Sequence, residues 1–263
     1  MWIAVDSYIE LDTIDLALAL GIMGIAIALS SWQRLALEGQ LVFATGRSLL
    51  QLMVVGYILE FVFAVDNPLG VLVILGIMLT IAAIVARNRI GKQIKGLLPV
   101  VWGSLLAGAA LTLSYTMVLI VQPPNWYEPQ YLIPLAGMIL GNGLNTASLC
   151  GERLVSKIKS SPLEIETHLS LGATPKQAIA TYRTEAIRTG LIPTINSMMV
   201  VGMVSLPGMF TGQVLAGSDP LNAASYQILI LFAIALTNLT TALLVTEGVY
   251  RRFFNGDCQL ILL

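Results

Sequence analysis

The sequence contains repeated apolar stretches of about 20 residues, each long enough to cross the hydrocarbon core of a membrane as one helix. Hydrophobic residues make up 56% of the chain and charged residues 11%, whereas soluble domains carry roughly 25% charged residues. The sequence therefore predicts an all-α, polytopic transmembrane helix bundle that forms one domain over residues 1–263. Surrounding lipid is the expected environment of most of its surface.

Seven spans are predicted, separated by turns rich in Pro, Gly, Asn and Asp or by basic loops. They are expected at about 14–32, 46–65, 69–86, 97–121, 131–150, 191–213 and 223–249. All 14 Lys and Arg residues fall in or beside the first, third and fifth loops and the C-terminal tail. The positive-inside rule then places the N-terminus outside and the C-terminus in the cytoplasm. The acidic N-terminus lacks a basic region, so no cleavable signal peptide is expected.

Residues 151–190 form the one long loop, and their sequence predicts two short helices joined by a tight turn. Ser161-Pro162-Leu163-Glu164 has the pattern of a capping box with proline at the first helical position. Gly172 suits the left-handed position that ends a helix. Thr174-Pro175-Lys176-Gln177 repeats the helix-start pattern. The second helix is expected to carry Ala178, Ile179, Tyr182 and Ala186 on one face.

This cytoplasmic segment raises the question of catalysis, because His168 is the only histidine of the chain. It has no cysteine nearby and no evident Ser/Asp partner, and the chain lacks the HExxH, GxSxG and Walker A motifs. A surface histidine is the favoured interpretation, and we do not expect the chain to be an enzyme. The helix-turn-helix shape does not predict a nucleic-acid partner, since the loop is tethered to the membrane at both ends and its charges are mixed. A rigid elbow that receives force from a soluble partner fits better.

Glu166 and Gly172, followed by Ala173 and by Ile192-Pro193, resemble the cytoplasmic coupling loop of ABC transporter permeases. Thr167-His168 stand where that loop usually has Ala-Ala, and the proline falls farther on. Three blocks, "IPLAGMILGN" (133–142), "LSLGATPKQA" (169–178) and "VSLPGMFTGQVLAGSDP" (204–220), resemble the FetB-type iron-export permease family, which includes plant aluminium-tolerance half-transporters. The resemblance covers essentially the whole chain and is strongest from about 131 to 235.

This resemblance implies the membrane subunit of an ABC transporter that exports iron or a related metal ion from the cell through the plasma (inner) membrane. A separate ATPase subunit would hold ATP and magnesium, two copies of each chain would assemble, and this chain would bind no cofactor. The implied ATPase-coupling residues are Glu166, Gly172, Ala173, Thr174, Pro175 and Lys176. The alternatives are an ABC permease for an organic substrate such as a nucleotide-sugar, an intramembrane enzyme, and a seven-span receptor outside the ABC class.

Polar residues at membrane depth are candidates for a substrate path, because they are costly there. The candidates are Asn142, Asn145, Asn196, Met203, Met209 and Glu60, with Ser197 and Asn238 as further polar positions. The plainer alternatives are hydrogen bonds between helices for the amides, packing for the methionines, and contact with the outer interface for Glu60. No cluster of Cys, His, Asp and Glu has metal-ligand spacing, so the metal ligands are unknown. Pro207 and Gly208 are expected to kink or break the sixth span, as a hinge or as a static bend.

Overall fold

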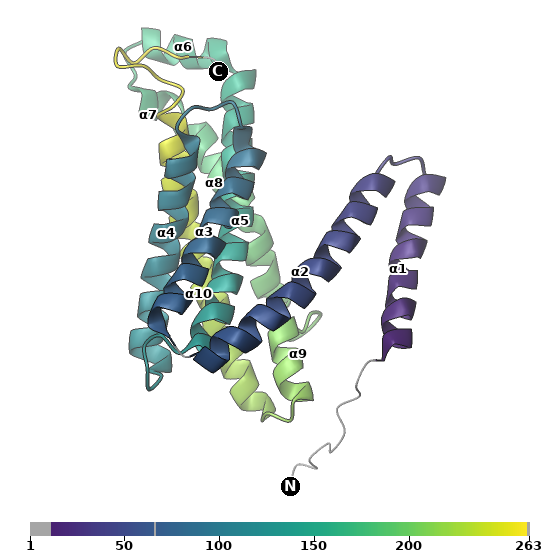
Figure 1. Ribbon diagram of the computed structural model, residues 1–263. Coiled ribbons are helices and arrows are strands. Elements are labelled where there is room, and N and C mark those ends of the chain that lie inside the picture. Colours follow the sequence, from purple (N-terminus) through teal and green to yellow (C-terminus); the bar gives the residue numbers. More distant parts are fainter. Residues whose placement is uncertain (1–11, 66, 262–263) are drawn as a thin grey trace. The chain divides into compact units, whose positions relative to one another are not determined.

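The computed structural model describes residues 12–65 and 67–261, and its regular elements within these ranges are helices (Figure 1). The predicted all-α fold is confirmed. The helices are α1 (Thr13–Trp32), α2 (Glu38–Val65), α3 (Pro68–Gly91), α4 (Leu97–Tyr115), α5 (Pro129–Ser160), α6 (Pro162–Ser170), α7 (Pro175–Ala178), α8 (Ala180–Val200), α9 (Gly208–Leu215) and α10 (Pro220–Tyr250), with a π-helical segment η1 (Thr116–Val121) that continues α4.

Six stretches of the described chain are helical, long enough and apolar enough to cross a membrane: α1, α2, α3, α4 with η1, α5 and α10. The expected span at 191–213 is not a single helix, which corrects that prediction. There α8 ends at Val200, residues 201–207 form a turn, and α9 begins at Gly208. Gly202 adopts a left-handed φ of 79°, and Pro207 has no backbone N–H to offer a helix. The expected break near Pro207 and Gly208 is therefore present, and it begins several residues earlier.

The chain divides into two compact units, Met1–Asn67 with Leu215–Gly217, and Pro68–Val214 with Ser218–Leu263. In the first unit, α1 and α2 are joined by a short turn in which Arg34 and Ala36 have positive φ angles. Ser30 Oγ donates a hydrogen bond to Glu38 Oε1 at 3.2 Å across this turn. Almost all described side chains of the two helices are exposed, and most are apolar. Helices that are hydrophobic all round belong in lipid or against another membrane helix.

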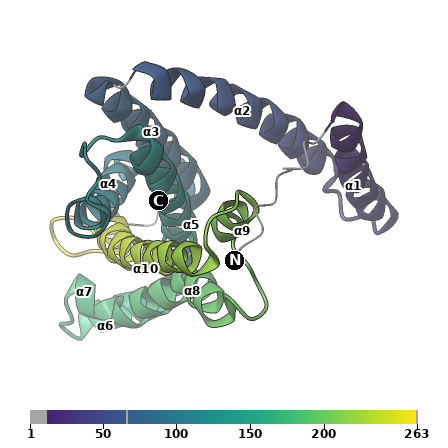
Figure 2. The ribbon, with the colours of Figure 1, turned by 90° about the horizontal axis from the view of Figure 1, so that it is seen from below.

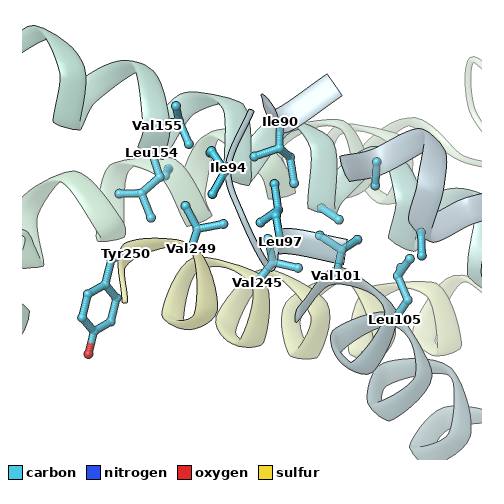
Figure 3. Close-up of a cluster of buried hydrophobic side chains, with 14 of the residues drawn as sticks. Ile90, Ile94, Leu97, Val101, Leu105, Leu154, Val155, Val245, Val249 and Tyr250 are labelled. Carbon is cyan, nitrogen blue, oxygen red and sulfur yellow. The ribbon is translucent and has the colours of Figure 1, made fainter. Parts of the chain in front are cut away.

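In the second unit, α10 packs against α4, α5 and α8, and α3 packs against α4 and α5 (Figure 2). The buried cluster lies where α3, α4, α5 and α10 meet (Figure 3). Its members include Ile90, Ile94, Leu97, Val101, Leu105, Leu154, Val155, Val245, Val249 and Tyr250. The protein is therefore a multi-pass membrane protein whose second unit has a core of its own.

Glycines set the closest helix contacts of this unit. A Cβ on Gly108 of α4 would lie 2.7 Å from Thr241 Oγ1 of α10, and one on Gly151 of α5 would lie 2.5 Å from Ile90 Cδ1 of α3. A Cβ on Gly190 of α8 would overlap Cys150 Sγ of α5. Small residues allow such approach in membrane helices. The helices can pack this closely only while these positions carry no side chain.

Three segments lie at one end of this unit: the α3–α4 turn with Lys92 and Lys95, helices α6 and α7, and the C-terminal end of α10, which Arg251 and Arg252 follow (Figure 1). A Cβ on Gly96 would lie 2.7 Å from an Arg252 guanidinium nitrogen, so the α3–α4 turn lies beside the C-terminal end of α10. Residues 257–260 and the elbow residues Glu166 and Ala173 line a common depression. The charge bias of the sequence predicts that these segments share one side of the membrane.

Candidate functional site

The elbow (residues 161–179) begins with α6, which ends in a Schellman motif. The N–H of Ala173 donates to the carbonyl of His168 at 3.0 Å, and the N–H of Gly172 donates to that of Leu169 at 3.0 Å. Gly172 has a φ of 91°, which glycine adopts at little cost because it has no Cβ. The expected helix end is confirmed. At the start of α6, Pro162 occupies the first turn, but Ser161 makes no side-chain capping bond, so the capping box expected there is wrong.

The second half of the elbow follows the expected pattern. Thr174 caps α7 with the predicted capping box, in which Gln177 N donates to Thr174 Oγ1 at 3.4 Å and Thr174 N donates to Gln177 Oε1 at 2.8 Å. The helix is interrupted at Ile179, whose φ of −104° and ψ of 3° separate α7 from α8. The four residues expected on one face are all buried: Ala178, Ile179, Tyr182 and Ala186. The elbow is therefore fixed by its buried face, while His168 is exposed.

Ion pairs hold the first half of α8 between α5 and α10; we call this set of contacts the α8 clamp. On the α5 side, Glu185 forms an ion pair with Arg153 and lies 3.5 Å from Lys157 Nζ. On the α10 side, Arg183 Nη2 lies 3.3 Å from Glu247 Oε2. Arg183 also donates to Thr246 Oγ1 at 3.2 Å and to the Leu243 carbonyl at 3.1 Å. A displacement of the elbow would therefore pass through α8 to both neighbouring helices.

Acid is expected to weaken the α5 side of this clamp. The hydrogen bond from Arg153 is the main cause that holds the pKa of the Glu185 carboxyl below its ordinary value. Partial desolvation acts in the opposite direction, and the positive charge of Lys157 lowers this pKa further. A carboxyl with a depressed folded-state pKa stabilises the fold above its unfolded pKa, and this contribution is lost as the pH falls through the folded value.

We therefore expect Glu185→Gln to reduce the loss in melting temperature that accompanies acidification from pH ~7 to ~3.5. Thermal unfolding of the purified protein at both pH values measures this difference. Glu166→Gln is the control, since Glu166 is exposed on α6, forms no ion pair with another described residue and should leave the acid-dependent loss unchanged. Equal losses in Glu185→Gln and the parent protein would contradict a stabilising role of the Glu185 pairs.

A cavity of about 400 Å³ lies beyond the clamp, between α5, the second half of α8, the 201–209 segment and α10. Seven residues singled out from the sequence line it: Asn142, Asn145, Ser197, Pro207, Gly208, Met209 and Asn238. Its other walls come from residues far apart in the chain. They are Met138, Thr146, Leu149, Gly190, Pro193, Thr194, Val201, Ser205, Gln227, Ile230, Leu231 and Ile234.

The structure does not bring every predicted residue to this cavity. Asn196 is exposed and lies outside its walls, because Pro193, Thr194 and Ser197 are on the helix face that lines it. Met203 is 81% exposed in the 201–207 turn and also lies outside the walls. Glu60 is exposed in α2, which belongs to the other unit. The substrate-path role predicted for these three residues stays a prediction without support from the cavity.

Sequence reasoning missed Gln227, Thr194 and Ser205 as cavity residues. Gln227 is the clearest omission, since it is a buried amide in an apolar helix and lies 11 residues from Asn238, close to three helical turns. That spacing places both side chains on one face of α10, which is a signal that the sequence carries. Thr194 and Ser205 have no comparable pattern, because hydroxyl residues are common in membrane helices.

The polar groups of the cavity are partly satisfied by one another. Asn142 Nδ2 donates to the Met138 carbonyl at 2.8 Å, and Asn238 Nδ2 donates to Thr194 Oγ1 at 2.7 Å. Asn238 Oδ1 and Gln227 Oε1 are buried and have no hydrogen-bond partner in the described part of the chain. Buried polar atoms are usually paired. These two oxygens are therefore candidates to accept from a bound molecule or to coordinate a cation.

The cavity offers only weak metal ligands. The described part of the chain contains no group of three or more His, Cys, Asp or Glu side chains that could hold a metal ion. The cavity walls supply amide oxygens, hydroxyls and the thioethers of Met138 and Met209. Amide and hydroxyl oxygens suit hard cations, and thioethers suit soft ones. A tight resident metal site does not fit these residues.

Comparison with known proteins adds independent information. The model of the uncharacterised protein family UPF0014 matches residues 13–254. A UPF0014 membrane protein of Synechocystis sp. is 62% identical over 253 residues, which are 96% of this chain and 98% of that protein. The Escherichia coli protein named "Probable iron export permease protein FetB" is 39% identical over 248 residues, 94% of each chain.

A plant protein extends this comparison. Protein ALUMINUM SENSITIVE 3 of Arabidopsis thaliana is 33% identical over 249 residues, which are 93% of this chain and 88% of that protein. No solved structure matches the chain. The resemblance to the FetB-type permeases and their plant relatives is therefore confirmed over nearly the whole length.

Proposed function

This chain belongs to the uncharacterised protein family UPF0014, and we propose that it is the membrane permease subunit of an ABC transporter that exports iron or a related metal ion. The name of the Escherichia coli relative, a probable iron export permease, supports the direction and the cargo. ATP and magnesium would be bound and hydrolysed on a separate ATPase subunit. Two copies of this chain would form the transport unit in the plasma membrane, with the elbow on the cytoplasmic side.

The continuity of α8 carries the proposal. This helix starts one residue after the elbow helix α7, passes through the α8 clamp at Arg183 and Glu185, and lines the cavity from Gly190 to Ser197. Helices transmit displacement along their axis because their packed side chains and backbone hydrogen bonds resist compression. An ATPase that pushes on the elbow would therefore move one wall of the cavity directly.

The helix break after Val200 leaves the C-terminal end of α8 without a continuous helix to hold it in place. Residues 201–207 are held by a few backbone hydrogen bonds, among them Gly202 N to the Ser205 carbonyl at 3.0 Å and Val204 N to the Val200 carbonyl at 3.0 Å. Pro207 and Gly208 follow, at the start of α9 and in the cavity wall. A hinge here would let α8 and α9 change their angle while α5 and α10 keep theirs.

Replacing Gly172 by valine together with Pro175 by alanine is expected to uncouple ATP hydrolysis from transport. Valine at a φ of 91° strains the turn although it meets no neighbouring atom, and alanine removes the proline that fixes the first turn of α7. Coupling free energies of about 1–3 kcal/mol correspond to about 5- to 150-fold effects. We expect a loss of transport per ATP hydrolysed in this range.

The measurement uses the chain co-purified with its ATPase subunit in proteoliposomes, with metal export and ATP hydrolysis recorded together. His168→Ala is the matched control, because His168 lies on the same elbow, is exposed and should leave both rates unchanged. Normal coupling in the Gly172→Val/Pro175→Ala protein would contradict the role of the elbow. Failure to co-purify with any ATPase would contradict the ABC assignment and favour a multi-pass membrane protein of another class.

An organic cargo such as a nucleotide-sugar is the second candidate function. The size of the cavity and its buried amide oxygens favour it, since they suit a hydrogen-bonding solute as well as a metal species. Transport of metal by proteoliposomes that contain the chain and its ATPase would distinguish the two. Export of a metal-free organic solute with no metal transport would replace the metal proposal.

A further inference from the structure

The three membrane segments around the cavity contain no charged residue along its length. Within α5 none occurs between Glu128 and Glu152, and the 189–218 segment likewise has none. In α10 the first charged residue is Glu247, near the C-terminal end of the helix. The cavity walls are therefore built from amides, hydroxyls, thioethers and apolar side chains.

Such walls are a poor place for a bare multivalent cation. An unpaired charge that leaves water for an apolar environment costs several kcal/mol or more after relaxation. Transition-metal sites in proteins meet this cost with carboxylate, imidazole or thiolate ligands, and the described cavity walls offer none of them. The volume of about 400 Å³ is that of a pocket for a small organic molecule and much larger than a single ion needs.

A cation contacts one of the residues that line the cavity. Arg89 of α3 donates from Nη1 to Asn145 Oδ1 at 3.4 Å, and Asn145 lines the cavity. Arg89 is exposed, and among the described residues no carboxylate lies within ion-pair distance of it. Its charge disfavours a positively charged ligand at this wall and favours an anionic one.

Two other residues of the cavity lining offer acceptors. Gln227 is 8% exposed and Asn238 is 1% exposed, both line the cavity, and each keeps one oxygen without a partner. The bond from Asn238 Nδ2 to Thr194 Oγ1 fixes that amide so that its oxygen stays free. These oxygens suit hydroxyl or N–H donors of an organic molecule. A ligand with both donors and anionic groups would engage Gln227 and Asn238 in the cavity and Arg89 beside the lining residue Asn145.

We propose that the cavity takes the metal as a complex with an organic ligand whose net charge is zero or negative, with Arg89 as the counter-charge, and that it does not take the hydrated cation. This inference rests on the proposed function of metal export. It names the form of the cargo: the organic ligand supplies the metal-binding groups that the chain lacks. The protein then recognises the outer surface of the complex.

The test uses the chain with its ATPase subunit in proteoliposomes under reducing conditions. Three probes are compared: Fe²⁺ alone, Fe²⁺ with an excess of citrate, and citrate alone. We expect the iron–citrate complex to be transported and to stimulate ATP hydrolysis, with little effect of Fe²⁺ alone or citrate alone. Transport of Fe²⁺ alone as efficiently as the complex would overturn the inference and leave the proposed metal export intact. No transport of iron in either form would contradict the proposed function itself and the inference with it.

Two substitutions are expected to have opposite effects on transport of an anionic iron complex and of the hydrated cation. Arg89→Gln removes the positive charge, and Asn145→Asp places a carboxylate within reach of Arg89. If the cargo is an anionic complex, both substitutions are expected to raise the iron–citrate concentration that half-saturates transport by about 5- to 10-fold. Arg89→Lys should keep most of the affinity, because lysine retains the positive charge. For a bare cation, both would lower that concentration or leave it unchanged.

Both positions are exposed, so the variants are expected to fold. Their thermal unfolding is recorded beside the transport assay. An unchanged half-saturating concentration for iron–citrate in Arg89→Gln would overturn the role of Arg89 and show that its side chain faces only lipid headgroups or water.

Discussion

Replacing Gly190 by valine is expected to lower the melting temperature of the protein by roughly 6–12 °C, because it forces α5 and α8 apart. A Cβ at this position would overlap Cys150 Sγ and lie 3.3 Å from the carbonyl oxygen of Thr146. Cys150 is fully buried, so its side chain has little room to rotate away. Overpacking costs about 3 kcal/mol at the upper end of its usual range, and 1 kcal/mol corresponds to about 2–4 °C for a chain of this size.

Thermal unfolding of the purified protein in detergent measures this effect, with Gly141→Val as the matched control. Gly141 also lies in a long helix of the same unit, but a Cβ there would meet no atom within 4 Å. Both variants carry the same glycine-to-valine change in helix propensity, so the difference isolates the helix contact. Gly190→Ala combined with Cys150→Ala should recover stability relative to Gly190→Ala alone, since it removes the overlapping sulfur. Equal melting temperatures for Gly190→Val and Gly141→Val would contradict the close approach of α5 and α8.

Replacing Arg183 by alanine is expected to disconnect α8 from α10 and to reduce transport per ATP hydrolysed by about tenfold or more. Arg183 makes three contacts with α10, to Glu247, Thr246 and the Leu243 carbonyl. Its side chain is 20% exposed, so water replaces these contacts poorly. Hydrogen bonds to charged groups contribute about 1.5–3 kcal/mol, and every 1.4 kcal/mol of coupling free energy is about tenfold.

Coupled measurement of metal export and ATP hydrolysis tests this prediction. Arg188→Ala is the control, because Arg188 is an exposed arginine on the same helix that forms no ion pair with another described residue. Arg183→Lys should give an amount of transport per ATP hydrolysed between those of Arg183→Ala and the parent protein. Lysine keeps the charge but lacks the planar guanidinium that reaches three acceptors. Normal coupling in Arg183→Ala would show that the contact between α8 and α10 plays no part in transmission.

Comparison of prediction and structure shows where sequence patterns are informative. The ends of the elbow helices were predicted correctly at Gly172 and Thr174, because Schellman motifs and capping boxes join residues only three to five positions apart. The same reasoning failed at Ser161, where the side chain makes no capping bond. The long helices followed from apolar length alone, although α5 continues ten residues past its expected end at 150.

Packing between helices was harder to predict. The pairs Gly137–Gly141 and Gly208–Gly212 have the spacing of helix-contact motifs, yet a Cβ on three of these four glycines would meet no atom within 4 Å. Gly190 and Gly108 make the close approaches without such a pair. Which glycine faces a neighbour depends on the rotation of each helix about its axis, and the spacing of small residues leaves that rotation open.

The sequence by itself determined the all-helical membrane fold, the elbow and the resemblance to the iron-export permeases, because these depend on composition and on residues near one another in the chain. The sidedness of the basic loops stays a prediction of the charge pattern. Only the tertiary structure decided that Asn142, Asn145 and Met209 share a cavity with Gln227 and Asn238, and that Arg89 donates a hydrogen bond to Asn145. It also decided that Arg183 and Glu185 clamp α8 to helices 32 to 63 residues away in sequence. Side chains so distant in sequence meet only when helices pack at one particular rotation and height, which no local pattern specifies.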